Sequence, residues 1–139
     1  MRPYLRFYFC IFILYIPIYL CAQINTPFLE NFSRDVYRGG TQNWAVAQGH
    51  DGIMYFANND GLFTFDGKKW KSYKLPSGIR LRALYVNDDG RIYSGGFEEF
   101  GYWEKDDWGN LIYYSLSKQF NDFELRNDEV WSIAKLKGT

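Results

Sequence analysis

The residue types that catalyse reactions are scarce in this chain and lie in predicted turns. The single histidine, His50, stands beside Asp51 within Gly49-His50-Asp51-Gly52. A neighbouring histidine and aspartate suggest a catalytic triad, but no serine stands in the context of a nucleophile elbow. We therefore interpret His50 as a solvated turn residue. Adjacent carboxylates could form acid–base couples but are mostly solvated in turns; the pairs are Asp88-Asp89, Glu98-Glu99 and Asp106-Asp107. We predict no catalytic residue and expect that the chain is not an enzyme.

Signals for a metal or cofactor site are equally weak. Asn58-Asn59-Asp60-Gly61 is rich in oxygen ligands, but it lacks the alternating ligand spacing and the later bidentate glutamate of a calcium loop. Gly95-Gly96 lacks the flanking pattern of a phosphate-binding loop, so we interpret it as a bend that permits close packing. Both cysteines, Cys10 and Cys21, lie in the apolar N-terminal segment, which leaves none for a zinc site elsewhere. We predict no metal and no cofactor.

The tryptophans are the strongest candidates for ligand contact. Aromatic ring faces suit the apolar C–H surfaces of sugars, but most aromatic side chains in proteins instead bury a large area in the core. Packing is therefore the expected role of any single one. The tryptophans are Trp44, Trp70, Trp103, Trp108 and Trp131. Which of them could meet a ligand depends on the elements that position them.

Those elements repeat along the chain. Asp51-Gly52 and Asp89-Gly90 lie 38 positions apart, and so do Tyr55 and Tyr93. A fixed period of this length is the sequence signature of a repeat architecture. The expected organisation is a leader over residues 1–22, a lead-in over 23–42, one unit over 43–75, a second over 79–117, and the start of a third over 128–139.

Each complete unit is predicted to form four short strands separated by turns that contain Gly, Asp and Asn. Asp-Gly between apolar runs is a strong hairpin signal, and four strands in about 40 residues, in tandem, are typical of β-propellers. We predict an all-β fold: a β-propeller fragment of two four-stranded antiparallel blades plus the first strand of a third, which stops at Thr139. The first strand of each unit is apolar on both faces, so we expect it to be buried near the centre.

The repeat gives three residues equivalent places. Trp44, Arg82 and Trp131 each stand at the start of the first strand of a unit. In a propeller these positions would lie together near one end of the central channel, where ligands commonly bind. An arginine there could bind a carboxylate or a pair of hydroxyls with its forked donors. We therefore predict that Trp44, Arg82 and Trp131 bind a ligand.

The N-terminus is predicted to be a signal peptide. Arg2 and Arg6 precede an almost wholly apolar run over residues 7–20, and Leu20-Cys21-Ala22 offers a cleavage site. The run is shorter than the roughly 20 residues that span a bilayer. Two alternatives are an uncleaved anchor and a lipoprotein with Cys21 as the lipidated residue, although Leu20 is bulky for the latter. We expect an exported protein whose mature chain has no disulfide and depends on packing.

Charge and composition exclude some partners. Lys and Arg number 16, as do Asp and Glu, so the formal net charge is zero. Without residues 1–22 the chain keeps 14 basic and 16 acidic residues. So even a balance gives no electrostatic footprint for nucleic acid or for an anionic membrane surface. The aromatic fraction of 21% favours strands over helices.

Several extended segments resemble the two-component regulator propeller family. Residues 42–48, 55–62 and 65–70, including Asn58-Asn59-Asp60-Gly61-Leu62, look like the opening blade of that family. Residues 90–96, followed by Glu99-Phe100-Gly101-Tyr102-Trp103, look like its second blade. The resemblance covers roughly residues 28 to 135, nearly all of the expected mature chain.

This resemblance implies a large membrane-spanning regulator of Gram-negative bacteria. Its periplasmic propellers would sense a ligand, often a glycan, and its cytoplasmic histidine kinase or helix-turn-helix region would control transcription. The expected partners are an oligosaccharide, the remaining blades of the parent protein and a second copy in a dimer, with no direct contact of this segment to nucleic acid. The alternatives are a fragment of an exported propeller enzyme, such as a lyase or glycosidase, and a truncated chain without function.

Overall fold

The computed structural model of the chain describes residue 8 and residues 27–75, 78–120 and 125–136. The chain forms two compact units, residues 1–31 and residues 32–139. In the first unit, residues 27–31 form neither helix nor strand. Of residues 1–22 only Tyr8 is described, so the predicted signal peptide lies outside the described residues. None of the described helices is long and apolar enough to cross a membrane.

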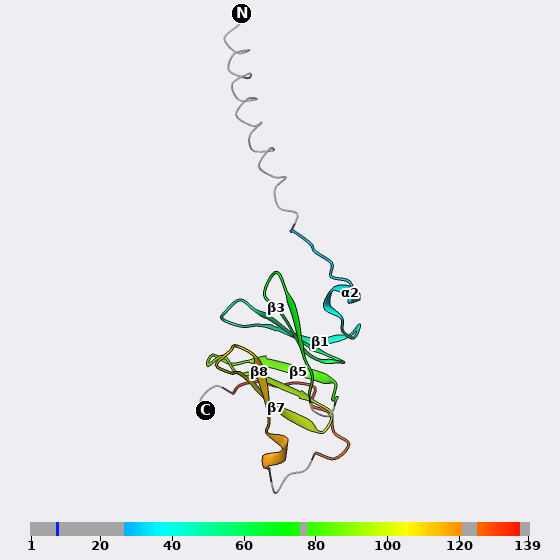
Figure 1. Cartoon of the computed structure of the whole chain (residues 1–139), viewed down its shortest axis with the longest axis vertical. Coiled ribbons are helices and arrows are strands. Elements are labelled where there is room, and N and C mark those ends of the chain that lie inside the picture. The colour runs from blue at the N-terminus through cyan, green and yellow to red at the C-terminus, as the bar shows by residue number, and fades with distance from the viewer. Residues whose placement is uncertain (1–7, 9–26, 76–77, 121–124, 137–139) are drawn as a thin grey trace, which may run out of the picture. The chain divides into compact units, whose positions relative to one another are not determined.

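The second unit is built from two four-stranded antiparallel sheets, and the predicted all-β class is confirmed (Figure 1). The first sheet contains β1 (Asn43–Gln48), β2 (Met54–Asn58), β3 (Gly61–Phe65) and β4 (Trp70–Tyr73). The second contains β5 (Leu81–Val86), β6 (Ile92–Gly96), β7 (Glu99–Lys105) and β8 (Leu111–Ser115). Strand order follows chain order in both sheets, so each is an up-and-down meander. The described residues form two such sheets and no closed ring.

The two Asp-Gly turns have the same local structure in both sheets. Gly52 and Gly90 have φ values of 79° and 87°, which glycine adopts without steric cost. The preceding carboxylates, Asp51 and Asp89, each accept the backbone N–H two residues further on, at 3.1 and 3.0 Å. The hairpins form where the sequence predicts them because both residues of each turn favour this backbone geometry.

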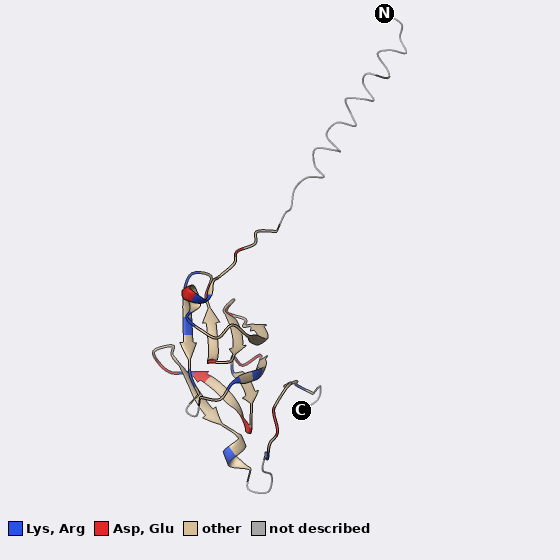
Figure 2. Ribbon diagram, turned by 90° about the vertical axis from the view of Figure 1, so that its right-hand side faces the viewer, with Lys and Arg blue, Asp and Glu red and all other residues tan. Residues whose placement is uncertain are grey.

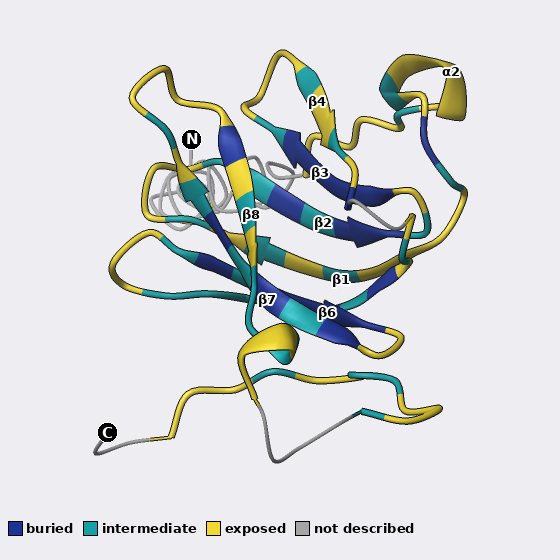
Figure 3. Cartoon of the chain, turned by 60° about the horizontal axis from the view of Figure 1, so that its bottom comes forward, coloured by how far each residue is buried: buried dark blue, intermediate teal, exposed yellow. Residues whose placement is uncertain are grey.

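The core lies between the sheets. The pairing register places Tyr55 and Ala57 on the face of the first sheet that packs against the second. From the second sheet, Ile92 and Trp103 complete the same cluster, and both are buried. Burial is concentrated in β2, β3, β6 and β7 (Figure 3). This two-layer packing is what holds the starts of β1 and β5 together.

The two sheets pack through faces that are not equivalent in the repeat. Tyr55 packs in the core between the sheets, whereas its equivalent Tyr93 lies on the opposite face of the second sheet, because Ile92 and Ser94 on either side of it are buried. That opposite face carries a ladder of tyrosines, one from each strand: Tyr85, Tyr93, Tyr102 and Tyr114. Their ring centroids are 6.4, 5.9 and 5.2 Å apart in that order. Stacking in one direction is how the blades of a propeller pack.

The expectation that the first strand is buried on both faces is wrong for β1. Val46 is 57% exposed, and the strand carries no fully buried residue. Val46 pairs with Phe56 on the face turned away from the second sheet, so nothing from β5 covers it. In β5, by contrast, Leu81 and Ala83 are buried. The apolar sequence of a strand shows that it can be buried, but the neighbouring layers decide which face is.

Residues 130–134, expected as the first strand of a third unit, do not form a strand. Their neighbour Glu129 makes an isolated antiparallel bridge with Phe97. The Val130 amide donates to the Gly96 carbonyl oxygen at 3.0 Å. A Cβ on Gly95 would lie 2.6 Å from Val130 Cγ1, so glycine permits this close approach, although it stands within β6 rather than in a bend. A strand needs successive ladder bonds, and in the described residues this segment has only a short pairing with the β6–β7 turn.

The lead-in contains a short helix that the sequence did not indicate. Helix α2 (Arg34–Tyr37) ends at Arg38, which has a left-handed φ of 53°. Four residues are too few to produce a helical period in the sequence. The rings of Phe32 and Tyr37 lie 5.4 and 5.5 Å from the ring of Trp70, so this segment covers the outer strands of the first sheet on the face away from the second.

Candidate functional site

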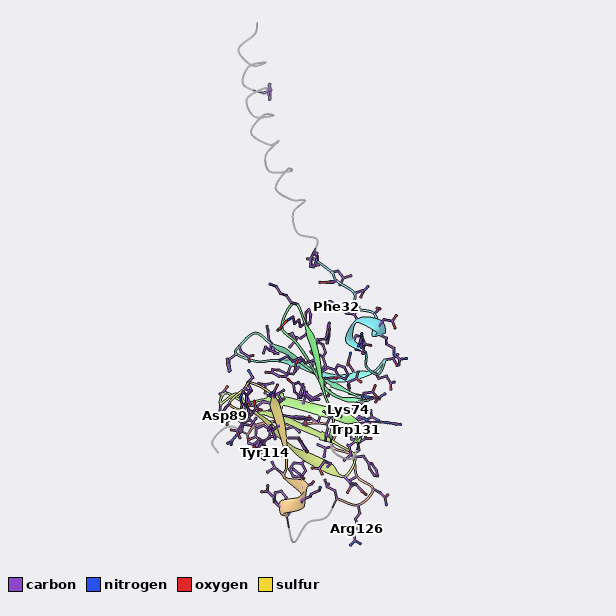
Figure 4. The ribbon with its side chains drawn as sticks, viewed as in Figure 1. Phe32, Lys74, Asp89, Tyr114, Arg126 and Trp131 are labelled. Carbon is purple, nitrogen blue, oxygen red and sulfur yellow. The ribbon has the colours of Figure 1, made fainter. Side chains whose placement is uncertain are left out.

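The three residues predicted to bind a ligand lie next to one another. Arg82 of β5 places its guanidinium carbon 4.0 Å from the ring centroid of Trp44, at the start of β1. The same atom lies 5.7 Å from the ring of Trp131. The tryptophan rings are 6.0 Å apart and meet edge to face, at 70°. The structure therefore brings together one residue from each sheet and one from the segment after β8, at the end of the sheets opposite Asp89 (Figure 4).

The guanidinium group of Arg82 is held by two polar side chains. Its Nε donates to Glu129 Oε1 at 2.6 Å, and its Nη1 donates to Asn59 Oδ1 at 2.9 Å. The side chains of Arg82 and Glu129 are only 11% and 21% exposed. A short, charge-assisted hydrogen bond in such surroundings is strong. Arg82 therefore already forms hydrogen bonds with Glu129 and Asn59 within the protein.

Asn59 and Glu129 belong to the site but were not predicted from the sequence. Asn59 Oδ1 also accepts the indole N–H of Trp44 at 2.9 Å, so one oxygen orients both Trp44 and Arg82. A signal for Glu129 was present, since it stands two residues before Trp131, which places both side chains on one side of an extended chain. Asn59 carried no such signal, because it comes from the β2–β3 turn.

The oxygen-rich segment at residues 58–61 has a structural role. Asn58 is fully buried, and both its amide nitrogen and its amide oxygen form hydrogen bonds with neighbouring residues. Its Nδ2 donates to the Gly40 carbonyl and to Asn43 Oδ1, both at 2.8 Å. Its Oδ1 accepts the Gly40 and Asp60 amides at 3.1 and 3.0 Å. The side chain thus ties the lead-in, β1 and the turn together beneath the site. Over the described residues, no three His, Cys, Asp or Glu side chains form a group that could hold a metal ion.

A charged pocket lies at the other end of the sheets, between the two Asp-Gly turns. Its volume is about 400 Å³, and its lining includes His50, Tyr55, Arg91 and Lys105. His50 Nε2 lies 3.5 Å from Asp88 Oδ1, and both side chains are largely exposed. Exposed pairs of this kind contribute little energy. The geometry agrees with the interpretation of His50 as a solvated turn residue.

The pair between Lys105 and Asp51 joins the two sheets at this pocket. Lys105 Nζ donates to Asp51 Oδ2 at 2.7 Å. Burial by itself raises the pKa of Asp51, but the hydrogen bonds from Lys105 and from the Ile53 amide outweigh it, so the pKa lies below the ordinary 3.8. Burial and the nearby Asp51 carboxylate raise the pKa of Tyr55 to about 12, which keeps its hydroxyl neutral. The described charges of both signs are interspersed along the sheets (Figure 2).

Acid should weaken this contact between the sheets. Because the pKa of Asp51 is lowered on folding, its contribution is present above pH 3.8 and is lost as the pH falls through the folded-state pKa. We expect the free energy of unfolding of Asp51→Asn to fall less steeply than that of the wild type between about pH 5 and about pH 1. Urea unfolding followed by circular dichroism across this range measures the difference. Asp107→Asn, at an exposed aspartate, is the matched control and should keep the wild-type slope; equal slopes in all three proteins would contradict the assignment.

The acidic pairs divide into two kinds. Asp106 accepts the Trp108 and Asn110 amides in the β7–β8 turn, at 3.0 and 2.7 Å, as expected of a turn residue. Glu99 does not fit the solvated-turn interpretation, because it lies in β7 and is buried. Its Oε1 accepts three hydroxyl groups, those of Tyr113, Ser115 and Ser117, at 3.0, 2.6 and 2.8 Å. Burial, followed by the Glu99 charge, raises the pKa of Tyr113.

The other tryptophans have separate roles. Trp103 is 2% exposed and donates to Ser94 Oγ at 2.8 Å. Trp70 stacks on Phe65, with ring centroids 4.7 Å apart. Trp108 is 85% exposed in the β7–β8 turn. Packing is therefore the role of Trp70 and Trp103, while Trp44 and Trp131 share the cluster with Arg82.

Comparison of the chain with protein-family models, with curated proteins and with solved structures gives no match. The resemblance to two-component regulator propellers therefore remains an expectation from the sequence. The feature of the structure that bears on function is the cluster formed by Trp44, Arg82 and Trp131.

Proposed function

We propose that this chain is the N-terminal part of the periplasmic ligand-sensing propeller of a membrane-spanning regulator that responds to a glycan. It would act by binding, with the signal passed to the rest of the protein through rearrangement of packed blades. The observation that carries the proposal is the meeting of Trp44, Arg82 and Trp131. Trp44 and Arg82 stand at the starts of β1 and β5, and Trp131 stands at the position that the sequence repeat makes equivalent to them.

The exposure of the cluster favours a binding role. Trp44 and Trp131 are 41% and 61% exposed, whereas a purely structural tryptophan such as Trp103 is buried. Tryptophan is enriched at interfaces, because it offers a large apolar ring together with a polar N–H group. The charged groups in the cluster, Arg82 and Glu129, bond to each other. The arrangement is therefore suited to recognition more than to proton transfer.

The way the sheets stack supports the propeller in this proposal. The first sheet packs on one face of the second, and the tyrosine ladder on the other face is equivalent to the face that the first sheet uses. A further four-stranded sheet of the parent protein would pack on that ladder. The full-length regulator would work as a dimer, with its output module in the cytoplasm.

The proposal is tested by sequencing the genomic DNA downstream of the Thr139 codon. We expect an open frame that continues into more repeats of this length, then a transmembrane helix and a histidine kinase or helix-turn-helix region. A stop codon with no such sequence beyond it would overturn the regulator proposal. A frame that continues into further repeats without a transmembrane helix or output module would favour an exported binding protein or enzyme and would also overturn it.

A further inference from the structure

We infer that the surface formed by Trp44 and Trp131 binds an uncharged saccharide and rejects acidic ones, and that Arg82 is a positioning residue rather than the group that contacts the ligand. This inference rests on the proposed function, which leaves the class of glycan open. It also replaces the initial hypothesis, in which Arg82 itself binds a carboxylate or a pair of hydroxyls on the ligand. The reason is that the positive charge of Arg82 is already paired with Glu129.

The charge on Arg82 is compensated within the protein. Glu129 Oε1 lies 2.6 Å from its Nε, and the arginine side chain is only 11% exposed. The next donor, Nη1, is occupied by Asn59. A ligand carboxylate approaching Arg82 would have to displace Glu129 or lie beside its negative charge. Leaving a partly buried carboxylate without its partner is costly, so an acidic sugar gains little from this arginine.

Arg82 instead fixes the rings that remain accessible. Its guanidinium lies over Trp44 at 4.0 Å and near Trp131 at 5.7 Å, both within the range of cation–π contact. Asn59 binds the indole N–H of Trp44 and Arg82 together, which sets the angle of that ring. The rings meet at 70°, so they form a corner rather than a flat stack. Arg82 thus determines the shape of the surface by fixing the orientation of the Trp44 and Trp131 rings.

The surface formed by Trp44 and Trp131 is aromatic and carries no net charge. The exposed parts of Trp44 and Trp131 provide ring faces and edges for sugar C–H groups. The partly exposed Glu129 carboxylate and the Asn59 amide lie alongside and can accept or donate to hydroxyl groups. Since Arg82 and Glu129 cancel, no net charge favours an anion or a cation. An uncharged pyranose or furanose residue fits this chemistry best.

Glu129→Gln is the decisive variant, because it keeps the shape of the side chain and removes the charge that neutralises Arg82. Titration calorimetry on the full chain would compare three neutral probes (maltohexaose, xylohexaose and mannohexaose) with tetragalacturonate. For the wild type we expect at least one neutral probe to bind about tenfold or more tightly than tetragalacturonate. For Glu129→Gln we expect tetragalacturonate to bind about tenfold more tightly than it does to the wild type. Glu104→Gln, at an acid that pairs with Arg91, is the matched control and should behave like the wild type.

Two further variants keep the test valid if Glu129→Gln folds poorly. Trp131→Ala removes an exposed ring and should abolish neutral binding, while Trp108→Ala removes another exposed ring and should not. Preference of the wild type for tetragalacturonate, or an unchanged ratio in a folded Glu129→Gln, would overturn the inference and leave the sensor proposal standing. Binding of no probe would overturn both the inference and the glycan response, whereas the downstream reading frame decides on the regulator independently.

Discussion

Trp103→Ala is expected to destabilise the two-sheet unit by about 3–5 kcal/mol, the usual cost of deleting a fully buried tryptophan. Natural domains of this kind are stable by only about 5–15 kcal/mol, so the variant should be largely unfolded or close to it. Urea unfolding followed by far-UV circular dichroism measures the loss.

The size of this effect follows from what Trp103 touches. Its ring lies 4.9 Å from that of Tyr113 in the same sheet and 6.2 Å from that of Tyr73 in the other sheet. It is therefore one of the residues through which the sheets pack. Its indole N–H donates to Ser94 Oγ inside the core. Ser94→Ala should cost less, about 1–3 kcal/mol, because it leaves the ring in place and removes only the partner of the N–H.

Trp108 provides the control within the same hairpin. It is 85% exposed, five positions further along the chain. Trp108→Ala should change the free energy of unfolding by no more than about 0.5 kcal/mol, as surface substitutions usually do. If the two alanine variants lost equal stability, the packing of the sheets through Trp103 would be wrong.

Asn58→Ala is expected to cost about 2–4 kcal/mol, because it removes a fully buried amide and leaves four hydrogen-bonding groups of its neighbours, including the N–H and carbonyl of the half-buried Gly40, without that partner. The Asn58 amide satisfies both the N–H and the carbonyl of Gly40, together with the Asp60 amide and the Asn43 side chain. Water cannot replace these contacts easily, since the side chain is fully buried. Alanine removes all four contacts at once.

Two measurements separate this prediction from general destabilisation. Urea unfolding gives the total cost, and hydrogen exchange reports the protection of the Gly40 amide, which should fall more than that of the Asn87 amide at the other end of the sheets. Asn110→Ala, at an exposed turn residue, is the matched control and should change stability by no more than about 0.5 kcal/mol. Full protection of the Gly40 amide in Asn58→Ala would show that Asn58 does not hold the lead-in.

Much of the fold was predictable from the sequence because strands and hairpins are encoded locally. The apolar runs between turns of Gly, Asp and Asn, together with the Asp-Gly pairs at Asp51 and Asp89, predicted four strands in each of the two units, because each signal acts within a few residues. The 38-residue period also placed Trp44 and Arg82 at equivalent positions. Equivalent positions in stacked repeats lie close together, which is why these residues meet in the structure.

What the tertiary structure alone decided is how charge and burial are distributed over those strands. The sequence around Glu99 suggested a solvated turn, but Glu99 lies in β7 and its carboxylate accepts hydrogen bonds from three hydroxyl groups. The exposure of Val46 depends on which layers cover β1.

The pairing of Arg82 with Glu129 joins residues 47 positions apart. That contact forms only when the segment after β8, which carries Glu129, pairs with the β6–β7 turn at Phe97. Local backbone preferences favour strands, so the eight strands of the two sheets could be predicted from the sequence alone. The hydrogen-bond partners of a side chain depend on which surfaces meet in the folded protein. The tertiary structure is therefore needed to show that Arg82 pairs with Glu129.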